Sequence, residues 1–365
     1  MSYSAGYTKS VTACIDMQAL RYNLTSIRSQ VKNSKIMAVI KANAYGHGIC
    51  HVAKHSEFAD AFAVARIEEA LKLRASNVLK PILLLEGFNS PSDLQVLVTQ
   101  NIQIVVHCEE QLLALEQAKL NMPIVVWLKI DSGMHRLGIH PNQYGDFITR
   151  LKACSNIAQP LYYMSHFSCA DELDRSVTQN QLKLFLSLTH DCDGELSIAA
   201  SAGLLAWKES YLDWVRPGLI MYGLSPFANS TGVDLGYRPV MTLKSLLISI
   251  RDIKTGDNVG YGEVWSSECY TKIGVVAIGY GDGYPRMTPA GTPVLLNGRE
   301  VPIVGRVSMD MLTIDLGFSA TDKVGDEVIL WGQQLPVEKI ARYIGTTAYE
   351  LVSKLTSRVS MEYFK

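Results

Sequence analysis

The chain has 365 residues, more than one hydrophobic core usually supports, so two domains are expected. Apolar residues make up 48% and charged residues 19%, the balance of an ordinary globular protein rather than a disordered one. The 34 Lys and Arg nearly cancel the 35 Asp and Glu, which leaves a formal net charge of -1. This lacks the basic excess of a protein that binds nucleic acid or a membrane surface, so a small-molecule ligand is favoured.

The N-terminus and the cysteines both point to the cytoplasm. Residues 1–10 lack the apolar core of a secretory signal, and no apolar run reaches the length of a membrane span. Seven cysteines are scattered along the chain without a Cys-x-x-Cys pair, which fits reduced thiols better than a disulfide framework.

Between residues 36 and 216, short apolar runs alternate with helical patterns. The eight runs cover residues 36–40, 60–65, 81–86, 102–107, 123–131, 160–166, 196–200 and 212–216. Helices are expected after Ser90 and Pro91, which suit an N-cap and a first helical position, and again from Pro141. Parallel strands buried on both faces read as continuous apolar runs, so this α/β alternation predicts a (β/α)8 TIM-like barrel over residues 11–235.

From about residue 236 the pattern changes to apolar and polar alternation with few helices. This predicts a second, C-terminal and mainly antiparallel β domain over residues 236–365. Helical patterns return only at 337–345 and over Tyr349 to Val359. A strand from residues 1–10, continuing into the alternating residues that begin at Val11, is expected to pair with this sheet.

Polar residues close all eight apolar runs of the expected barrel. They are Lys41, Arg66, Glu86, His107, Lys129 with Asp131, His166, Ser201 and Arg216. Any one polar residue at a strand end is most often a solvated loop residue. Because barrel enzymes carry their chemistry at the C-terminal ends of the strands, polar residues at every end predict a site at this mouth.

Lys41 is the first candidate for a reactive group. The loop that follows it contains Gly46 and Gly48, which permit close approach of the backbone to a ligand. A lysine at a strand end is usually structural, with its stem packed and its ammonium in water. Beside Arg136 and Arg216 at the barrel mouth, however, its pKa would be lowered, as a Schiff-base lysine requires.

The loops after the seventh and eighth runs are the usual phosphate site of such barrels, where backbone N–H groups at a helix N-terminus bind the anion. Ser201, Gly218 and Leu219 occupy these loops and are predicted to form a phosphate cradle. Ordinary tight turns remain the alternative interpretation.

Two other motifs are weaker. His47, Cys50, His51 and His55 resemble metal ligands in spacing, but the segment reads as a loop entering a helix and no second ligand cluster exists, so no metal is expected. The segment 279–284 (GYGDGY) has the glycines of a dinucleotide loop, yet it leads into a proline rather than a helix, and a dinucleotide site is rejected.

Seven motifs follow one another along almost the whole chain. They are KANAYGHG at 41–48, KIDSGMHRLG at 129–138, MSHFSCAD at 164–171, ASAG at 200–203, VRPGLIMYG at 215–223, GYGDGYPR at 279–286 and VGRVSMDM at 304–311. Together they resemble, in sequence and in order, the alanine racemases, a family of pyridoxal 5'-phosphate enzymes. The segment around Lys41 is the strongest single match.

The resemblance implies that Lys41 binds pyridoxal 5'-phosphate covalently and acts as one catalytic base, with Tyr45 near the phosphate. Tyr261 would be the second base, on the opposite face of the substrate α carbon. Arg216, bonded to His166, would face the pyridine nitrogen. Arginine hardly gives up a proton, so the cofactor stays a weaker electron sink, which favours racemisation over transamination.

The resemblance also implies how the substrate is held. Arg136 would support the phenolic oxygen of the cofactor and contact the substrate, Met309 and Asp310 would bind the substrate carboxylate, and Tyr280 would narrow the entrance. Lys129 corresponds to a position that is carbamylated in many relatives. In the family the second base and the three residues from the β domain belong to the second subunit, so a head-to-tail homodimer with shared active sites is expected.

Two departures from the family pattern concern cofactor affinity more than reaction type. Ala200 precedes the phosphate serine where relatives often have Asn, and Ser357 falls where some relatives place a phosphate-binding Tyr.

The predicted function is interconversion of L- and D-alanine, supplying D-alanine for cell-wall peptidoglycan. The alternatives are a racemase of serine or of a broader range of amino acids, and a non-catalytic pyridoxal-phosphate carrier, which the full second domain disfavours. A decarboxylase of the same architecture is opposed by Arg216, because loss of carbon dioxide benefits from a protonated ring nitrogen.

Overall fold

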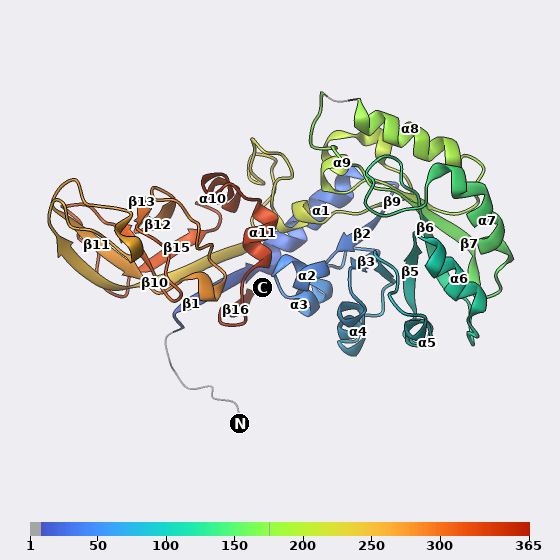
Figure 1. Ribbon diagram of the computed structural model, residues 1–365, viewed down its shortest axis with the longest axis horizontal. Helices are drawn as coiled ribbons and strands as arrows, with labels where there is room; N and C mark the ends of the chain where they lie inside the picture. Colours follow the sequence, from blue (N-terminus) through green and yellow to red (C-terminus); the bar gives the residue numbers. More distant parts are fainter. Residues whose placement is uncertain (1–8, 175) are drawn as a thin grey trace.

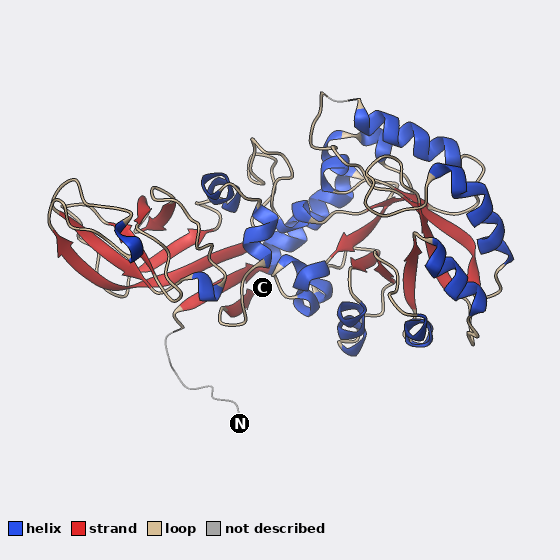
Figure 2. Cartoon of the chain, viewed as in Figure 1, coloured by secondary structure: helices blue, strands red, loops and turns tan. Residues whose placement is uncertain are grey.

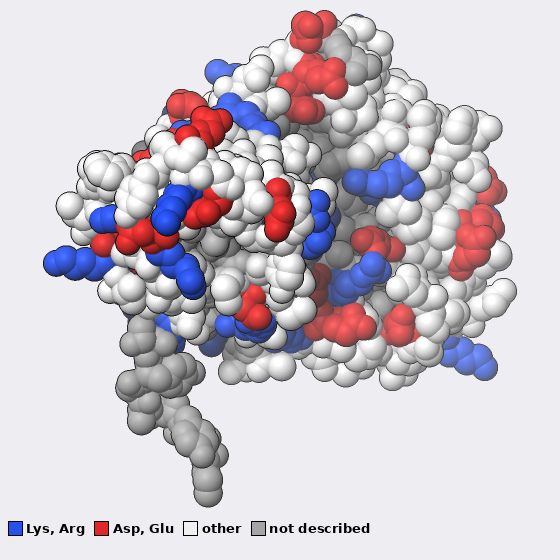
Figure 3. Space-filling model, turned by 60° about the vertical axis from the view of Figure 1, so that its left-hand side comes forward, with Lys and Arg blue, Asp and Glu red and all other residues white. Residues whose placement is uncertain are grey.

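The computed structural model describes residues 9–174 and 176–365 and consists of a barrel beside an extended sheet (Figure 1). The expected strand in residues 1–10 therefore lies almost entirely outside the described residues. Positive and negative side chains are interspersed over the face seen in Figure 3, in keeping with the near-zero net charge. Within the described part of the chain, no helix combines the length and the apolar character needed to cross a membrane.

Eight parallel strands close into a barrel in the order β2 to β9. They are β2 (Lys35–Val39), β3 (Ala61–Val64), β4 (Ile82–Leu84), β5 (Ile102–Val106), β6 (Ile124–Lys129), β7 (Ile157–Met164), β8 (Leu196–Ser197) and β9 (Trp214–Val215). Pairing of Lys35 with Trp214 joins β2 to β9 and closes the ring. Each strand overlaps one of the predicted apolar runs, although β7 begins three residues before its run and β8 and β9 are only two residues long. The predicted fold class is confirmed.

Helices cover the outside of the barrel (Figure 2). They are α1 (Met17–Gln30), α3 (Ile49–Lys54), α4 (Ile67–Ala75), α5 (Leu94–Thr99), α6 (Glu109–Gln117), α7 (Tyr144–Ala153), α8 (Val177–Thr189) and α9 (Ser201–Ala206). Both predicted proline starts open short 3-10 turns, η1 (Pro91–Asp93) and η2 (Pro141–Gln143), which lead into α5 and α7. The Ser90 hydroxyl caps the first of them by accepting a hydrogen bond from the Ser92 N–H.

Alternation along the strands decides which side chains enter the barrel. One set packs against the helices, and the other fills the interior. The interior set is Met37, Val39, Ala61, Ala63, Leu83, Val105, Trp127, Met164 and Trp214. Four polar residues each follow a member of this set by two positions and so point to the same side of the strand: Lys41, Lys129, His166 and Arg216. The period of two thus aims these four side chains into the barrel mouth.

The second part is an eight-stranded sheet with the order β11-β14-β13-β12-β15-β10-β1-β16. Its strands are β1 (Val11–Asp16), β10 (Met241–Ile253), β11 (Thr271–Val276), β12 (Pro293–Leu296), β13 (Arg299–Val304), β14 (Leu312–Asp315), β15 (Glu327–Trp331) and β16 (Ser360–Phe364). The β1 and β16 strands pair in parallel, and the other described neighbours are antiparallel.

The strand β1 belongs to this sheet, although the predicted division assigns residues from 11 onward to the barrel. It pairs with β10 on one side and β16 on the other, and Ala13 and Ile15 are fully buried. Asp16 then caps α1 by accepting hydrogen bonds from the N–H groups of Gln18 and Ala19. The chain therefore begins in the sheet, crosses to build the barrel, and returns at β10.

The predicted helix over Tyr349 to Val359 is wrong beyond its first turns. After α10 (Val337–Ile344), α11 (Ala348–Ser353) ends at Ser353, and the chain then enters β16. The N–H and hydroxyl of Thr356 donate to the carbonyls of Asp282 and Gly281. These tertiary hydrogen bonds replace those that a longer helix would form.

Candidate active site

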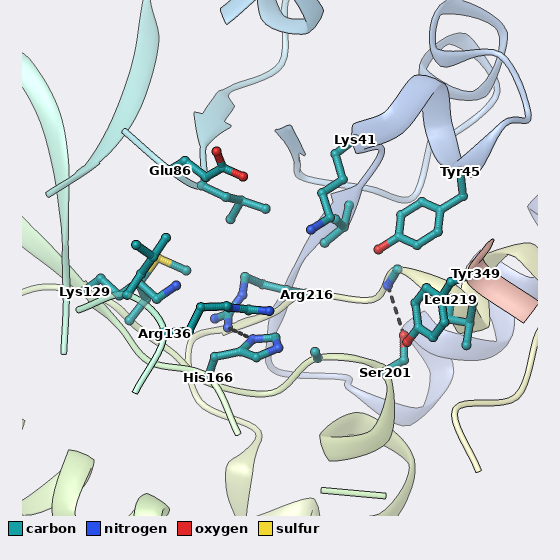
Figure 4. Close-up of a pocket in the computed structure, with 16 residues that line it drawn as sticks. Lys41, Tyr45, Glu86, Lys129, Arg136, His166, Ser201, Arg216, Leu219 and Tyr349 are labelled. Carbon is teal, nitrogen blue, oxygen red and sulfur yellow. Dashed lines mark hydrogen bonds between the residues drawn. The ribbon is translucent and has the colours of Figure 1, made fainter. Parts of the chain in front are cut away.

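A cavity of about 410 Å³ opens at the C-terminal mouth of the barrel (Figure 4). Nine of the predicted site residues line it: Lys41, Tyr45, Lys129, Arg136, His166, Ser201, Arg216, Gly218 and Leu219. The lining is completed by the strand-end residue Glu86, by Ala200, and by Val39, Leu85, Leu137, Met164 and Tyr349, which have no predicted site role. The structure thus brings together strand ends that are far apart in the sequence.

Lys41 and Tyr45 lie at the two ends of a left-handed turn. Its backbone hydrogen bonds give this segment the form of a short helix, α2 (Lys41–Tyr45), but the φ angles of residues 42–45 are 52°, 54°, 57° and 52°. Left-handed backbone costs an L-residue roughly 1–2 kcal/mol each, so the turn must be held from outside. It directs both side chains into the cavity (Figure 4).

Gly46 and Gly48 approach the chain itself rather than an open ligand space. A Cβ on Gly46, at a φ of 81°, would lie 2.0 Å from the Val352 carbonyl oxygen of α11. A Cβ on Gly48, at a φ of 91°, would lie 2.1 Å from the Tyr363 hydroxyl of β16. The glycines therefore let the C-terminal segment pack directly against the Lys41 turn.

Arg216 is the most deeply buried cation of the cavity, with 3% of its surface exposed. Its Nη1 donates to Ser197 Oγ at 2.5 Å, and its Nη2 donates to the carbonyl oxygens of Ser165 at 2.6 Å and Ile198 at 3.1 Å. All three partners are neutral. Burial lowers the pKa of Arg216 to about 10, which still leaves the guanidinium charged at neutral pH.

The basic groups around Arg216 lose protons more easily than usual. Burial, followed by the charges of Arg216 and Arg136, lowers the pKa of Lys129 to about 8. Burial and then Arg136 lower the pKa of Lys41. Burial and Arg216 also hold the pKa of His166 well below its ordinary value. The neutral His166 accepts at Nδ1 from Arg216 Nη2, 3.3 Å away. The amines of Lys41 and Lys129, whose pKa values are lowered, can thus react as nucleophiles or bases.

The opposite end of the cavity gathers neutral hydrogen-bond donors. The N–H groups of Gly218 and Ile220 both point at Ser201 Oγ, at 3.1 and 3.3 Å. Burial raises the pKa of the Tyr45 phenol and raises that of Tyr349 to about 12, so both keep their protons at neutral pH. A Cβ at Gly218 would stand 2.8 Å from the Tyr45 hydroxyl. Converging N–H and O–H donors suit a bound anion such as phosphate.

Tyr349 is the polar lining residue that sequence reasoning missed among the described residues. It comes from α11, between the strands β15 and β16 in the sequence, and the centre of its ring lies 5.8 Å from that of the Tyr45 ring. Ser357, suspected of replacing a phosphate-binding tyrosine, is exposed and lies outside the lining. No local pattern marks Tyr349, because only the return of the C-terminal segment to the barrel brings it to the cavity.

Other strand-end residues act outside the cavity or at its edge. Arg66 pairs with Glu86 at 3.0 Å, and the His107 ring donates to the Glu86 carbonyl at 3.1 Å. Asp131 accepts at Oδ1 from the N–H groups of Gly133, Met134 and His135, and so holds the loop that leads to Arg136.

Four predicted residues are not brought to the cavity of this chain. Tyr261 and Tyr280 begin the 3-10 turns η5 (Tyr261–Glu263) and η6 (Tyr280–Asp282) of the sheet part, Met309 and Asp310 lie in a loop of it, and all four are outside the lining. Tyr261 is 71% exposed and Met309 is 52% exposed. Asp310 accepts from Arg358 Nη2 at 2.7 Å. If they act at a barrel mouth, it must be that of a second copy.

The residues that resemble metal ligands have other partners. His51 stacks on Tyr363 with 3.6 Å between ring centroids, and Cys50 Sγ accepts from the Ser76 hydroxyl at 3.0 Å. Among the described residues, no group of three or more His, Cys, Asp or Glu could hold a metal ion.

Fold and site together define a barrel enzyme with a lysine amine, an arginine-rich wall and an anion cradle at one mouth, joined to a mainly antiparallel sheet domain. Comparison with known proteins gives the family. The model "Alanine racemase, N-terminal domain" matches residues 15–226, and "Alanine racemase, C-terminal domain" matches residues 240–363. The chain belongs to the alanine racemase family and is an amino-acid racemase.

Relatives share this organisation over their whole length. Alanine racemases from Vibrio parahaemolyticus and Vibrio cholerae are 68% and 67% identical to the chain. The first match covers 98% of the chain and 100% of the relative, and the second covers 98% and 99%. The crystal structure of biosynthetic alanine racemase from Pseudomonas aeruginosa is similar with a TM-score of 0.95 at 42% identity, over 98% of this chain and 100% of that one.

The close contact at Gly46 gives a test of the Lys41 turn. Gly46→Ala introduces both a strained φ and a clash with the Val352 carbonyl, whereas Gly256→Ala has a φ of 84° and nothing within 4 Å. We expect G256A to cost about 1–2 kcal/mol and G46A at least about 2 kcal/mol more, measured by urea denaturation. Equal losses in the two variants would show that the approach of α11 to the turn is not tight.

Proposed function

We propose that the protein interconverts L- and D-alanine with pyridoxal 5'-phosphate as its cofactor. The observation that carries the proposal is the joint presence, in one cavity, of the Lys41 amine with a lowered pKa and an anion cradle built around Ser201 and Gly218. The names of the relatives support alanine as the substrate. We also propose a cytoplasmic location, with which the seven free cysteines agree. The D-alanine formed would supply cell-wall peptidoglycan.

The residues present fit a phosphorylated aldehyde. Neutral donors gather at one end of the cavity, and Gly218 leaves room there for the Tyr45 hydroxyl. Lys41 lies between this cradle and the wall that holds Arg136, His166 and Arg216 (Figure 4). A cavity of about 410 Å³ falls within the size range of small-molecule sites. The lysine would bind the aldehyde, and the cradle would bind the phosphate.

When bound, the cofactor withdraws electrons from the substrate α carbon and so acidifies its proton. Lys41 acts as the base on one face, because its lowered pKa leaves an amine that accepts a proton. Tyr261 of a second subunit acts on the opposite face. Removal from one face and return to the other inverts the configuration, whichever base acts first.

Arg216 and His166 lie at the end of the cavity that would hold the pyridine ring of the cofactor. The described hydrogen bonds of Arg216 use its two Nη atoms, and they fix its plane against Ser197, Ser165 and His166. Since its pKa of about 10 keeps it charged, Arg216 would offer the ring nitrogen of the cofactor a hydrogen bond rather than a proton. The cofactor would then be a weaker electron sink, which favours quick return of the proton over transamination.

The substrate side of the site is shared between subunits. Arg136, which lines the cavity, would hold the phenolic oxygen of the cofactor and contact the substrate. Met309 and Asp310 of the second subunit would bind the substrate carboxylate, and Tyr280 would narrow the entrance. The exposure of these β-domain residues in the single chain supports a head-to-tail homodimer.

Loss of the Lys41 amine tests the reaction. Wild-type protein with added pyridoxal 5'-phosphate should show the absorption band of the lysine-bound cofactor, and Lys41→Ala should lack it. Racemisation of alanine should fall by about 10³-fold or more in K41A, because base and attachment are lost together. D/L exchange is measured with alanine, serine, lysine and arginine, with alanine expected to be fastest, and Lys54→Ala on the exposed end of α3 serves as the lysine control. A wild type that stays colourless would refute the cofactor assignment.

Mixing two inactive variants tests whether sites are shared. Lys41→Ala and Tyr261→Phe should each be nearly inactive as homodimers. Co-expressed in equal amounts, they should regain about a quarter of wild-type activity, since half of the dimers are mixed and each has one intact site of two. The mixed dimer is also isolated with two affinity tags and assayed for D/L exchange of alanine, where its one intact site of two should give about half of wild-type activity. No recovery in the isolated mixed dimer would place both bases in one chain.

We also propose that Lys129 is carbamylated. Its neutral amine attacks carbon dioxide, a C–N bond forms, and the amine proton leaves to solvent, which converts a cation beside Arg136 and Arg216 into an anion. Because the pKa of Lys129 is about 8, the reactive neutral amine is more abundant above this pH and declines as the pH falls below it.

Protein incubated with 13C-labelled bicarbonate should therefore give a carbamate 13C NMR signal that weakens from pH 9 to pH 6 and is missing in Lys129→Ala. A wild-type spectrum without this signal at pH 9 would contradict the proposal.

A further inference from the structure

His47 lies against the Lys41 turn and has no part in the chemistry described above. Its side chain is fully buried, and its Nδ1 lies 2.9 Å from the Tyr45 carbonyl oxygen and 3.0 Å from that of Ala44. Both oxygens can only accept, so Nδ1 carries the proton and donates. The ring thereby ties down the carbonyls of two residues whose φ angles are 52° and 57°.

The surroundings of the second ring nitrogen, Nε2, keep the proton on Nδ1. Nε2 is buried and finds no hydrogen-bond partner among the described residues. Burial lowers the pKa of His47 to about 4, so the ring is neutral at physiological pH. Moving the proton to Nε2 would bury an unsatisfied N–H and turn a lone pair toward two carbonyls. His47 is thus held in the single tautomer that stabilises the turn.

An aromatic contact extends this support to the phosphate cradle. The His47 ring stacks on Tyr222 with centroids 4.5 Å apart, and Tyr222 packs against Tyr45 at 5.1 Å. The Tyr222 hydroxyl donates to the carbonyl of Val39, two residues before Lys41. Tyr222 also ends the short turn η4 (Leu219–Tyr222), which begins directly after Gly218. One ring pair therefore links the Lys41 strand, the left-handed turn and the cradle.

We propose that His47 is a positioning residue that fixes the separation of the Lys41 amine and the Tyr45 phenol, and with it the affinity for the cofactor. The inference rests on the proposed function, because it assumes that these two groups bind the same molecule. A strained turn persists only while its surroundings hold it. Without the His47 donor, the carbonyls of Ala44 and Tyr45 lose their bond to the ring, and only that of Ala44 keeps the backbone N–H of residue 47. The turn then relaxes, and its two ends no longer match the aldehyde and the phosphate.

The test compares three substitutions at position 47 with one distant control. His47→Asn places an amide N–H where Nδ1 stands, His47→Leu has a similar size without a donor, and His47→Gln moves its amide one carbon further out. His55→Leu is the histidine control, because His55 bonds to the His51 carbonyl at the exposed end of α3. Each protein is stripped of cofactor and titrated with pyridoxal 5'-phosphate by absorbance. Thermal midpoints of the stripped proteins, and kcat and KM for alanine at saturating cofactor, are measured alongside.

We expect the cofactor Kd of H47L to rise about tenfold or more, that of H47N to stay within about threefold of wild type, and that of H55L to be unchanged. H47L and H47N should have similar thermal midpoints, so that the difference in Kd reports positioning rather than global stability. If H47L does not fold, H47Q replaces it and should bind the cofactor about tenfold more weakly than H47N.

Equal cofactor affinities in H47N and in H47L, or in H47N and H47Q, would overturn the inference. A wild type that does not bind pyridoxal 5'-phosphate at all is a different result, because it would refute the proposed function on which the role of His47 rests.

Discussion

The site depends on an excess of positive charge that is gathered at one end of the barrel, where Lys129 and Arg216 are buried. Lys41, Lys129, Arg136 and Arg216 all line the same cavity, and the one carboxylate among the described residues that line it, that of Glu86, is paired with Arg66. Like charges in a buried space disfavour one another, so the groups that can release a proton do so. The same excess of positive charge attracts an anion. A phosphorylated cofactor at one end of the cavity and a carbamate on Lys129 at the other would each reduce this excess. The two proposals therefore rest on the same physical cause.

The catalytic turn is supported by both parts of the molecule. On the barrel side, β2 delivers Lys41, and Glu69 Oε1 of α4 accepts from the Asn43 N–H at 3.3 Å. On the other side, α11 and β16 lie against Gly46 and Gly48. Since β16 also pairs with β1, the last residues of the chain connect the sheet directly to the turn that holds the reactive amine. The sheet part therefore shapes the barrel site of its own chain, in addition to any contribution it makes to a partner.

Much of the fold follows from local pattern, and the site follows from the fold. The eight apolar runs predict the strands, and the period of two within each strand directs Lys41, Lys129, His166 and Arg216 toward the interior of the barrel.

What sequence reasoning missed depends on long-range contacts. Tyr349 reaches the cavity only because α11 returns to the barrel, and the helix predicted after it stops because Thr356 bonds to residues 281 and 282. The glycines after Lys41 signal close approach, but the sequence alone does not say that the approaching group is the chain's own C-terminal segment. The roles of Tyr261, Met309 and Asp310 stay predictions, because they require a second copy.

Burial is the largest influence that sorts the groups of the cavity into three chemical kinds. It disfavours charge of either sign, so it raises the pKa of the phenols Tyr45 and Tyr349 and lowers that of the amines Lys41 and Lys129. The phenols remain neutral donors suited to an anion, and the amines approach the neutral form that attacks an aldehyde or accepts a proton. Arg216 starts from so high a pKa that the same burial leaves it charged. One physical effect, acting on side chains of different intrinsic acidity, thus supplies donors, nucleophiles and a permanent cation within a single cavity.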